Sequence, residues 1–275
     1  MRASKCSTMF QSQACKTTNL TYQPMEDTML ENAVVGNEVE APSETQVWDL
    51  VGQTAHRRAA TYGLLSRLYR IEVDKEFLQE LKETRFPAKA GNALMDEGYR
   101  AIGKFLGGMT AGTELELRRD YVRAFIGEGT DGKSAAYPFE SVYTSENRLR
   151  MQDARDEVLA IYRSEGLNRS VDWHDDEDHV ALELEFMQFL CDKLANAVKI
   201  EDFDNAESLL ATQEGFLTEH LCNWVPLMTA DMRLFAKTTF YKGLASLTEG
   251  YLEMEQELLG ELLGTATEDD KQAAI

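Results

Sequence analysis

The sequence of 275 residues is long enough for one large domain or two small ones, and its hydrophobic fraction of 43% is sufficient for a core. The formal net charge of -20 and a pI near 4.6 argue against a nucleic-acid-binding protein, which would need a basic face. An acidic surface favours basic partners instead.

The cysteines and the apolar segments indicate the cellular compartment of the protein. Cys6, Cys15, Cys191 and Cys222 show no CxxC pair and no disulfide spacing, so we expect a reducing, cytoplasmic setting. No apolar run approaches the roughly 18 residues of a membrane span. The start of the chain lacks the apolar core of a signal peptide. We therefore expect a cytoplasmic protein without stable membrane insertion.

The N-terminal part of the chain predicts an extension followed by four helices. Residues 1–43 are polar and aperiodic, which predicts a disordered extension. Apolar residues at helical spacing then predict a first helix that begins near Ser43 and uses Val51, Ala55, Tyr62, Leu65 and Tyr69. A short helix capped by Asp74 should end at Glu83. Further helices are expected over Ala93–Met109 and Thr113–Ile126, the latter with a capping box of Thr113 and Glu116.

The rest of the chain also predicts helices. One should span about Ser145 to Glu165 and stop at Gly166, with an apolar side that includes Leu149 and Met151. A nearly enclosed helix, capped by Asp178, should follow through Leu194. Two more are expected over Asp204–His220 and from Phe240 to Leu262.

These elements predict an all-α protein, without a convincing run of strands. We expect a single helical domain of about nine to ten helices over residues 44–264. Its two helical halves should be joined by a hinge near residues 166–178, and residues 265–275 should form a flexible tail.

The segment Gly127–Ser134 matches the nucleotide-binding pattern GxxxxGK[ST] letter for letter. A phosphate-binding loop needs a strand before it and a helix that begins at its lysine, here Lys133. The preceding residues read as the end of a helix, and Pro138 interrupts any helix that follows. We therefore interpret the loop as a connector, with nucleotide binding as the alternative function.

Two other patterns resemble metal sites. Asp172, His174, Asp176, Asp178 and Glu183 echo a calcium-binding loop, but Glu177 replaces its sharp-turn glycine and His174 stands where an oxygen ligand belongs. A site built on His174 and His179 has no further ligand spacing to support it. We expect no metal, no cofactor and no catalytic residues, because no nucleophile with a base partner is visible. As a structural pair, Asp178 should cap a helix and His179 should lie in its first turn.

An ordered set of short segments resembles the TorD/DmsD-type molybdoenzyme chaperones, which are cytoplasmic all-helical proteins. The resemblance runs from about Trp48 to Leu263, and its segments keep the family's order. They are Arg123–Gly127, Pro138–Tyr143, Glu177–His179, Glu183–Met187, His220–Trp224, and Phe240-Tyr241 with Leu244 and Leu247.

The resemblance implies a non-enzymatic chaperone with a peptide-binding hinge. It would bind the twin-arginine signal peptide and the apo form of a molybdopterin oxidoreductase, a DMSO- or TMAO-reductase-like catalytic subunit, and delay export until the cofactor is inserted. An acidic rim beside an apolar groove suits such a leader. The signal-peptide-binding residues implied are Phe125, Pro138, Glu140, Ser141, Tyr143, Asp178 and His179, whereas Trp224 should pack between helices.

Some features lie outside what the resemblance explains. The family often has a proline before its Glu-Asp-His run, where this chain has Asp176, and the extension 1–43 has no assigned role. Weak guanine-nucleotide binding in some members leaves the Gly127–Ser134 loop open as a nucleotide site. The resemblance is compatible with a monomer or a domain-swapped dimer, and a purely structural helical adaptor remains a third interpretation.

Overall fold

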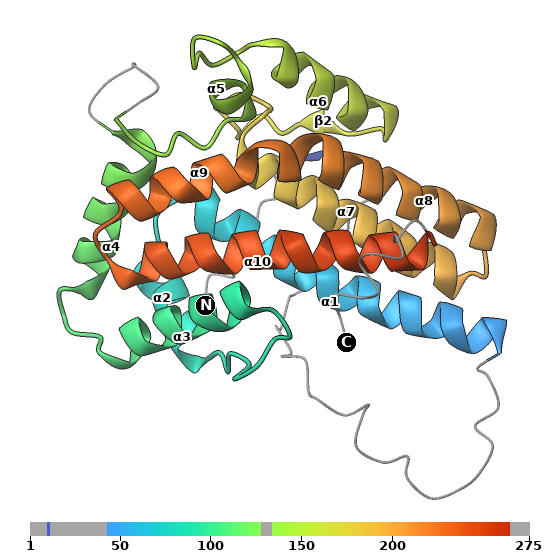
Figure 1. The fold of residues 1–275 in the computed structure, drawn as a ribbon, viewed down its shortest axis with the longest axis horizontal. Coiled ribbons are helices and arrows are strands. Elements are labelled where there is room, and N and C mark those ends of the chain that lie inside the picture. Colours follow the sequence, from blue (N-terminus) through green and yellow to red (C-terminus); the bar gives the residue numbers. More distant parts are fainter. Residues whose placement is uncertain (1–9, 12–42, 128–133, 265–275) are drawn as a thin grey trace, which may run out of the picture.

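Three long helices run along the length of the molecule: α1 (Glu44–Arg70), α7 (Val180–Lys199) and α10 (Thr239–Leu262) (Figure 1). They belong to a computed structural model that describes residues 10–11, 43–127 and 134–264. The predicted extension 1–43, apart from residues 10, 11 and 43, lies outside the described residues, as do residues 128–133 of the glycine-rich loop and the predicted tail 265–275. Within the described residues the fold is all-α, as predicted.

The remaining elements surround these helices. Their bounds are α2 (Lys75–Glu83), α3 (Ala93–Gly107), α4 (Thr113–Tyr121), the π-helical turn η1 (Val122–Ile126), α5 (Glu140–Thr144), α6 (Asp153–Ser164), α8 (Phe203–Phe216), the π-helical turn η2 (Leu217–Leu221) and α9 (Cys222–Phe235). Two short strands, β1 (Phe10–Gln11) and β2 (Asn168–Arg169), pair antiparallel. No helix of the described residues is long and apolar enough to cross a membrane.

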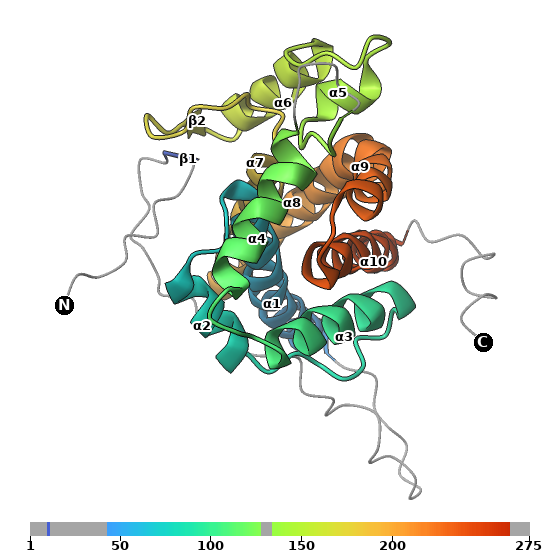
Figure 2. The ribbon, with the colours of Figure 1, turned by 90° about the vertical axis from the view of Figure 1, so that its left-hand side faces the viewer.

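The helices form a body with a smaller layer on one side. α1 packs along α7, and α3 packs along α10. Seen from the end of the molecule, α5, α6 and β2 lie together on one side of α7 and α9, whereas α2 and α3 lie on the opposite side (Figure 2). The small layer therefore meets the body where α5 approaches α7 and α9.

Local signals explain where the first helices begin. The Ser43 side chain accepts a hydrogen bond from the backbone of Gln46, and the Gln46 side chain accepts one from the backbone of Ser43. Asp74 caps α2 by accepting a hydrogen bond from the Phe77 N–H at 2.8 Å. Both starts were predicted, and the five predicted apolar residues of α1 are all buried.

The predicted central helix is α7, which is buried on nearly all sides, from Val180 to Val198. It crosses a core that also holds a buried ion pair between α1 and α10. The Arg58 Nε lies 2.9 Å from both Glu255 carboxylate oxygens, and the two side chains are 4% and 0% exposed. The pair fixes the register of two helices that the sequence places far apart.

Glycine lets α3 and α10 approach closely. A Cβ atom at Gly98 would lie 2.6 Å from the backbone nitrogen of Leu247 and 2.7 Å from the carbonyl oxygen of Gly243. A Cβ at Gly243 would likewise lie 2.8 Å from the Cβ of Ala101. The two backbones meet at a distance that side chains would prevent.

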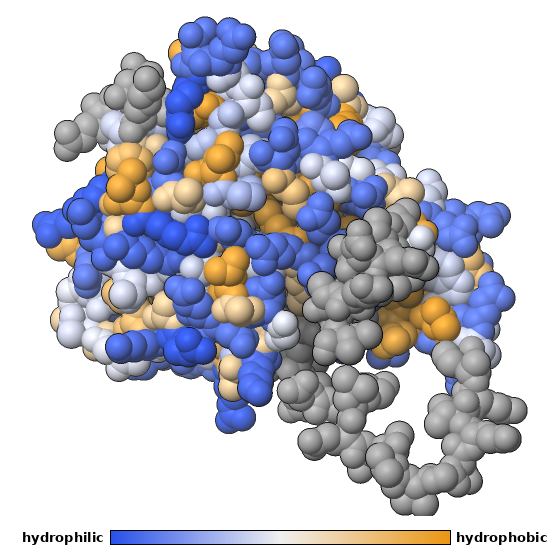
Figure 3. Space-filling model, in the orientation of Figure 1, coloured by the Kyte–Doolittle hydropathy of each residue, from blue (hydrophilic) through white to orange (hydrophobic). Residues whose placement is uncertain are grey.

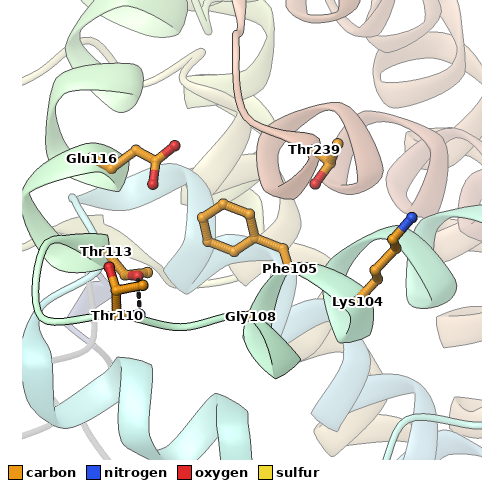
Figure 4. Close-up of a pocket in the computed structure, with 7 residues that line it drawn as sticks. All are labelled: Lys104, Phe105, Gly108, Thr110, Thr113, Glu116 and Thr239. Carbon is orange, nitrogen blue, oxygen red and sulfur yellow. Dashed lines mark hydrogen bonds between the residues drawn. The ribbon is translucent and has the colours of Figure 1, made fainter.

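The prediction for residues 113–126 was right in extent but wrong in detail. The N-cap of α4 is Gly112, which has no side chain, and Thr113 is the first helical residue. The Thr113 Oγ1 accepts a hydrogen bond from the Thr110 N–H at 2.8 Å instead of capping the helix (Figure 4). The α-helix ends at Tyr121, and its last turn continues as the π-helical turn η1.

The predicted helix Ser145–Glu165 begins too early. Only α6 is helical there, and residues 145–152 form a loop in which Arg148 and Met151 have positive φ values of 53° and 60°. Leu149 and Met151 are exposed, so they are not part of an apolar helix side. A helix across residues 222–235, now α9, was not predicted, and Pro226 lies inside it.

Candidate functional site

The segments that open α5 and α7 lie side by side. The Glu140 N–H donates to the Asp178 carbonyl oxygen at 3.0 Å, and the Val180 N–H donates to the Pro138 carbonyl oxygen at 2.9 Å. Phe139 and His179 thus form an antiparallel bridge. Residues of the predicted site that are about forty positions apart in the chain are joined through their backbones.

The caps at this bridge differ from the prediction for Asp178 and His179. His179 is the N-cap of α7, and its Nδ1 accepts a hydrogen bond from the Ala181 N–H at 3.0 Å. Asp178 instead reaches the other helix, where its Oδ2 accepts a hydrogen bond from the Ser141 N–H at 2.8 Å. Asp178 therefore does not cap its own helix, because its carboxylate is held by the first turn of α5.

His179 is confined by aromatic rings. The rings of Phe139 and Trp173 meet its imidazole edge-to-face, with centroids 5.0 Å and 5.2 Å away. Burial, assisted by the charge of Arg150, lowers the pKa of His179 to about 3. The ring is therefore neutral at physiological pH, as its role as a hydrogen-bond acceptor requires. Burial is the main cause of the lowered pKa.

A buried acidic cluster lies beneath the bridge, formed by Glu140, Glu183 and Asp178. The Glu140 carboxylate is 2% exposed and contacts the Nδ1 of His220 at 3.0 Å. Burial, together with the charges of Glu140 and Asp178, raises the pKa of Glu183 well above its usual value. Burial also raises the pKa of Asp178, partly offset by its hydrogen bonding to Ser141. Burial and the neighbouring charges thus favour the protonated form of Glu183 over its carboxylate.

Trp224 connects this cluster to the surface. It packs between helices, as predicted, and its Nε1 donates to Glu183 Oε2 at 3.0 Å. Its indole stacks on the ring of Tyr143, with centroids 5.6 Å apart. The Tyr143 hydroxyl donates to Asp231 Oδ2 at 3.1 Å, and burial, together with the Asp231 charge, raises the pKa of Tyr143. Tyr143 thus lies between a buried tryptophan and a partly exposed carboxylate.

One face of α9 flanks that carboxylate with apolar side chains. Leu227, Asp231 and Leu234 follow at intervals of four and three residues, so they share a face of the helix. Leu227 is 53% exposed and Leu234 is 67% exposed. Hydrophobic side chains are visible on the outer surface where α9 lies (Figure 3). This face was not predicted, because the sequence pattern indicated no helix over residues 222–235.

The structure brings six of the seven predicted site residues together. Pro138, Glu140, Ser141, Asp178 and His179 are buried at the bridge, and Tyr143, which is half-buried, lies at its edge. Phe125 has its ring contacts in the core instead: it is 3% exposed, with its ring against those of Tyr69, Tyr121 and Tyr241. The Glu140 carboxylate contacts His220 in this arrangement. The peptide-binding roles of all seven remain predictions.

The metal motifs do not form a site in the described residues, and the segment before the glycine-rich loop differs from that before a phosphate-binding loop. A π-helical turn, not a strand, precedes the glycine-rich loop, whose residues 128–133 are not described. Asp172 and His174 are exposed, whereas Glu183 lies buried inside α7 and hydrogen-bonds Trp224. No group of three or more His, Cys, Asp or Glu residues in the described ranges could hold a metal ion.

A cavity of about 290 Å³ lies elsewhere, between the end of α3 and the starts of α4 and α10 (Figure 4). Its lining includes Lys104, Phe105, Glu116 and Thr239, and none of the predicted site residues. A second hollow of about 330 Å³ lies against residues 144–147 and 152–154. Neither cavity gathers a set of reactive groups, so the site is better described as a surface at the bridge between α5, α7 and α9.

Comparison with known proteins points to one family. The model of the nitrate reductase delta subunit family matches residues 92–230, which reach from the start of α3 into α9. That range includes the paired segments, Tyr143, Trp224 and Leu227.

Individual relatives are chaperones by name. The chain is 24% identical over 212 residues to chaperone protein TorD of Photobacterium profundum, a match that covers 74% of this chain and 95% of that protein. It is 27% identical over 149 residues to chaperone protein TorD of Vibrio cholerae, covering 54% of this chain but only 64% of that protein. It is 35% identical over 107 residues to the perchlorate reductase assembly chaperone protein of Dechloromonas aromatica, covering 38% and 47%.

Proposed function

Because the chain belongs to the nitrate reductase delta subunit family, which includes the TorD-type molybdoenzyme chaperones, we propose that it is a cytoplasmic chaperone for a molybdopterin oxidoreductase. It binds the twin-arginine signal peptide and the apo form of a DMSO- or TMAO-reductase-like catalytic subunit. It delays export of that subunit until the cofactor has been inserted. The protein itself is not an enzyme.

The observation that carries the proposal is the face of α9 beside Tyr143. A twin-arginine leader presents two guanidinium groups followed by an apolar stretch. The face offers the matching features in a short space: the Asp231 carboxylate with the Tyr143 ring, flanked by the exposed Leu227 and Leu234. Arginine binds carboxylates through paired hydrogen bonds and stacks on aromatic rings. The net charge of -20 favours encounters with such a basic segment.

Four buried residues near the bridge, Glu140, Ser141, Asp178 and Glu183, support this surface rather than contact the peptide. Asp178 holds the first turn of α5, and Glu183 holds Trp224, on which Tyr143 stacks. These contacts fix the position of the Tyr143 ring relative to α9. We infer that Tyr143 contacts the leader directly. Glu140, Ser141, Asp178 and His179 hold the Tyr143 ring in place.

Calorimetric titration of the full chain with synthetic twin-arginine leader peptides tests the proposal. Saturable binding is expected, weakened when both arginines are replaced by alanine. Leu227→Ser with Leu234→Ser should weaken binding further. Leu115→Ser with Ile200→Ser is the matched control, because these residues are also exposed (53% and 61%) but lie on other elements. If none of several leader peptides gives a saturable heat of binding, the proposal is wrong.

A further inference from the structure

The loop between α5 and α6 holds two arginines of the chain itself, one against the surface just described and one against the ring of Phe139. Residues 145–152 contain Arg148 and Arg150, separated by Leu149. Positive φ values at Arg148 and Met151 are unusual for residues with side chains. Leu149 and Met151 are 49% and 61% exposed. The loop therefore exposes its apolar side chains, while its two arginines contact the protein and are 32% and 44% exposed.

The first arginine occupies a site made by Tyr143 and Asp231. The Arg148 Cζ lies 4.8 Å from the centroid of the Tyr143 ring, and its Nη2 lies 2.9 Å from Asp231 Oδ2. The buried Arg148 Nε has no hydrogen-bond partner among the described residues. The site thus holds a guanidinium group while leaving one of its donors unsatisfied.

The second arginine occupies a similar site one helical turn away. The Arg150 Cζ lies 3.8 Å from the centroid of the Phe139 ring. Its Nε lies 2.7 Å from Asp176 Oδ2, and its Nη2 lies 3.0 Å from Asp175 Oδ1. Each site therefore combines an aromatic ring with acceptors from a different part of the chain, the arrangement that guanidinium groups favour.

We propose that Arg148 and Arg150 are internal occupants of the guanidinium sites that the arginine pair of a client leader takes. The inference rests on the proposed function and adds its regulation: the leader must displace the loop 145–152 to bind. Phe139 and Tyr143 are four residues apart at α5, so their side chains are about one turn apart. Two arginines of one short peptide can reach both rings, because consecutive Cα atoms are about 3.8 Å apart.

Internal occupation lowers the apparent affinity for an external ligand by the fraction of molecules in which the sites are free. It also excludes weakly basic peptides, since only a ligand with two guanidinium groups replaces both internal contacts. Displacement would free the strained loop, with its exposed Leu149 and Met151. The loop would then add apolar surface next to the bound leader.

The test compares leader affinity between the wild type and Arg148→Gln with Arg150→Gln. Arg57→Gln with Arg118→Gln is the control, because it removes the same charge from exposed arginines on α1 and α4. The calorimetric Kd for a leader peptide should fall about tenfold or more in the test variant and change less than about twofold in the control. Asp231→Asn with Asp176→Asn should weaken binding, because it removes acceptors from both sites.

The possible outcomes separate this inference from the proposed function. If the wild type binds leaders and the Arg148→Gln, Arg150→Gln variant binds no more tightly, the internal-occupant inference is wrong and the chaperone proposal stands. If neither the wild type nor the variant binds any leader, both the internal-occupant inference and the chaperone proposal are wrong. Should the variant fail to fold, hydrogen exchange on the wild type decides. Leader binding should speed amide exchange in residues 145–152, and unchanged or slower exchange there overturns the inference.

Discussion

The Asp178 carboxylate accepts a hydrogen bond from the backbone N–H of Ser141, 2.8 Å away and 37 residues earlier in the chain. This bond fastens α5 to the segment that opens α7. Through α5 it fixes Tyr143, which stacks on Trp224 and donates to Asp231. The position of a half-buried aromatic ring therefore depends on a carboxylate that is fully buried.

Asp178→Ala should loosen α5. The Ser141 N–H would lose its acceptor inside the protein, at a cost of about 1–3 kcal/mol in the free energy of unfolding. Asp178→Asn keeps an acceptor oxygen at the same place and should cost less. The measurement is urea unfolding combined with amide exchange at Ser141. Asp172→Ala, an exposed aspartate of the same connection, is the control; equal effects of the two alanine variants would contradict this role.

Acid should destabilise the fold through His179. Its pKa falls from an ordinary value of 6.5 to about 3, so the unfolded chain binds a proton that the folded protein excludes. The stability it contributes is complete above pH 6.5 and is lost as the pH falls toward 3, by up to about 1.4 kcal/mol per pH unit. Unfolding free energies at several pH values in this range would show it.

His179→Asn is the matched variant, because asparagine also caps helices but does not titrate. Asp178 and Glu183, with raised pKa values, give the opposite slope in both proteins, so the difference between the two isolates His179. The variant should lose less stability on acidification. Parallel stability curves for the two proteins would rule out this assignment.

Gly98→Ala should disrupt the contact between α3 and α10. The added methyl group would overlap the backbone of Leu247 and Gly243, which a side-chain rotation cannot relieve. A loss of roughly 1–3 kcal/mol is expected in thermal or urea unfolding. Gly103→Ala in the same helix meets no atom within 4 Å and should stabilise the protein by up to ~1 kcal/mol. Similar effects of the two substitutions would show that the close approach is not needed.

The buried pair Arg58–Glu255 gives a prediction about non-additivity. Arg58→Met alone leaves the Glu255 carboxylate without its partner in the core and should cost about 3–5 kcal/mol. Arg58→Met with Glu255→Leu removes both charges and should be more stable than the single variant. A double-mutant cycle in urea measures this. A double variant that is less stable than Arg58→Met would contradict the expectation.

The sequence predicted those elements whose signals are local. The starts of α1 and α2 follow from Ser43 and Asp74, and the burial of α7 and α10 follows from apolar spacing. The loop 145–152 was wrongly predicted as helix because its conformation depends on Asp231, Asp175 and Asp176, which come from elsewhere in the chain. A propensity argument does not contain those partners.

The sequence predicted most of the residues that meet at the candidate site, but it did not predict the hydrogen bonds that each of them makes. The resemblance selected residues that, except for Phe125, meet at one bridge. It did not reveal that Asp178 caps α5 while His179 caps α7, because a local rule assigns an aspartate to the helix that follows it. Asp231 was missed since its significance comes from Tyr143 and Arg148, both more than 80 positions away.

The pairing of α3 with α10 and of Arg58 with Glu255 has a consequence for synthesis on the ribosome. The helices α1 and α3 are made long before α10, so the faces that pack on α10 lack their partner until α10 has emerged from the exit tunnel. During that interval the unfinished body is open to aggregation and to holding by ribosome-associated factors. The core of the protein is therefore completed only after α10 has been translated.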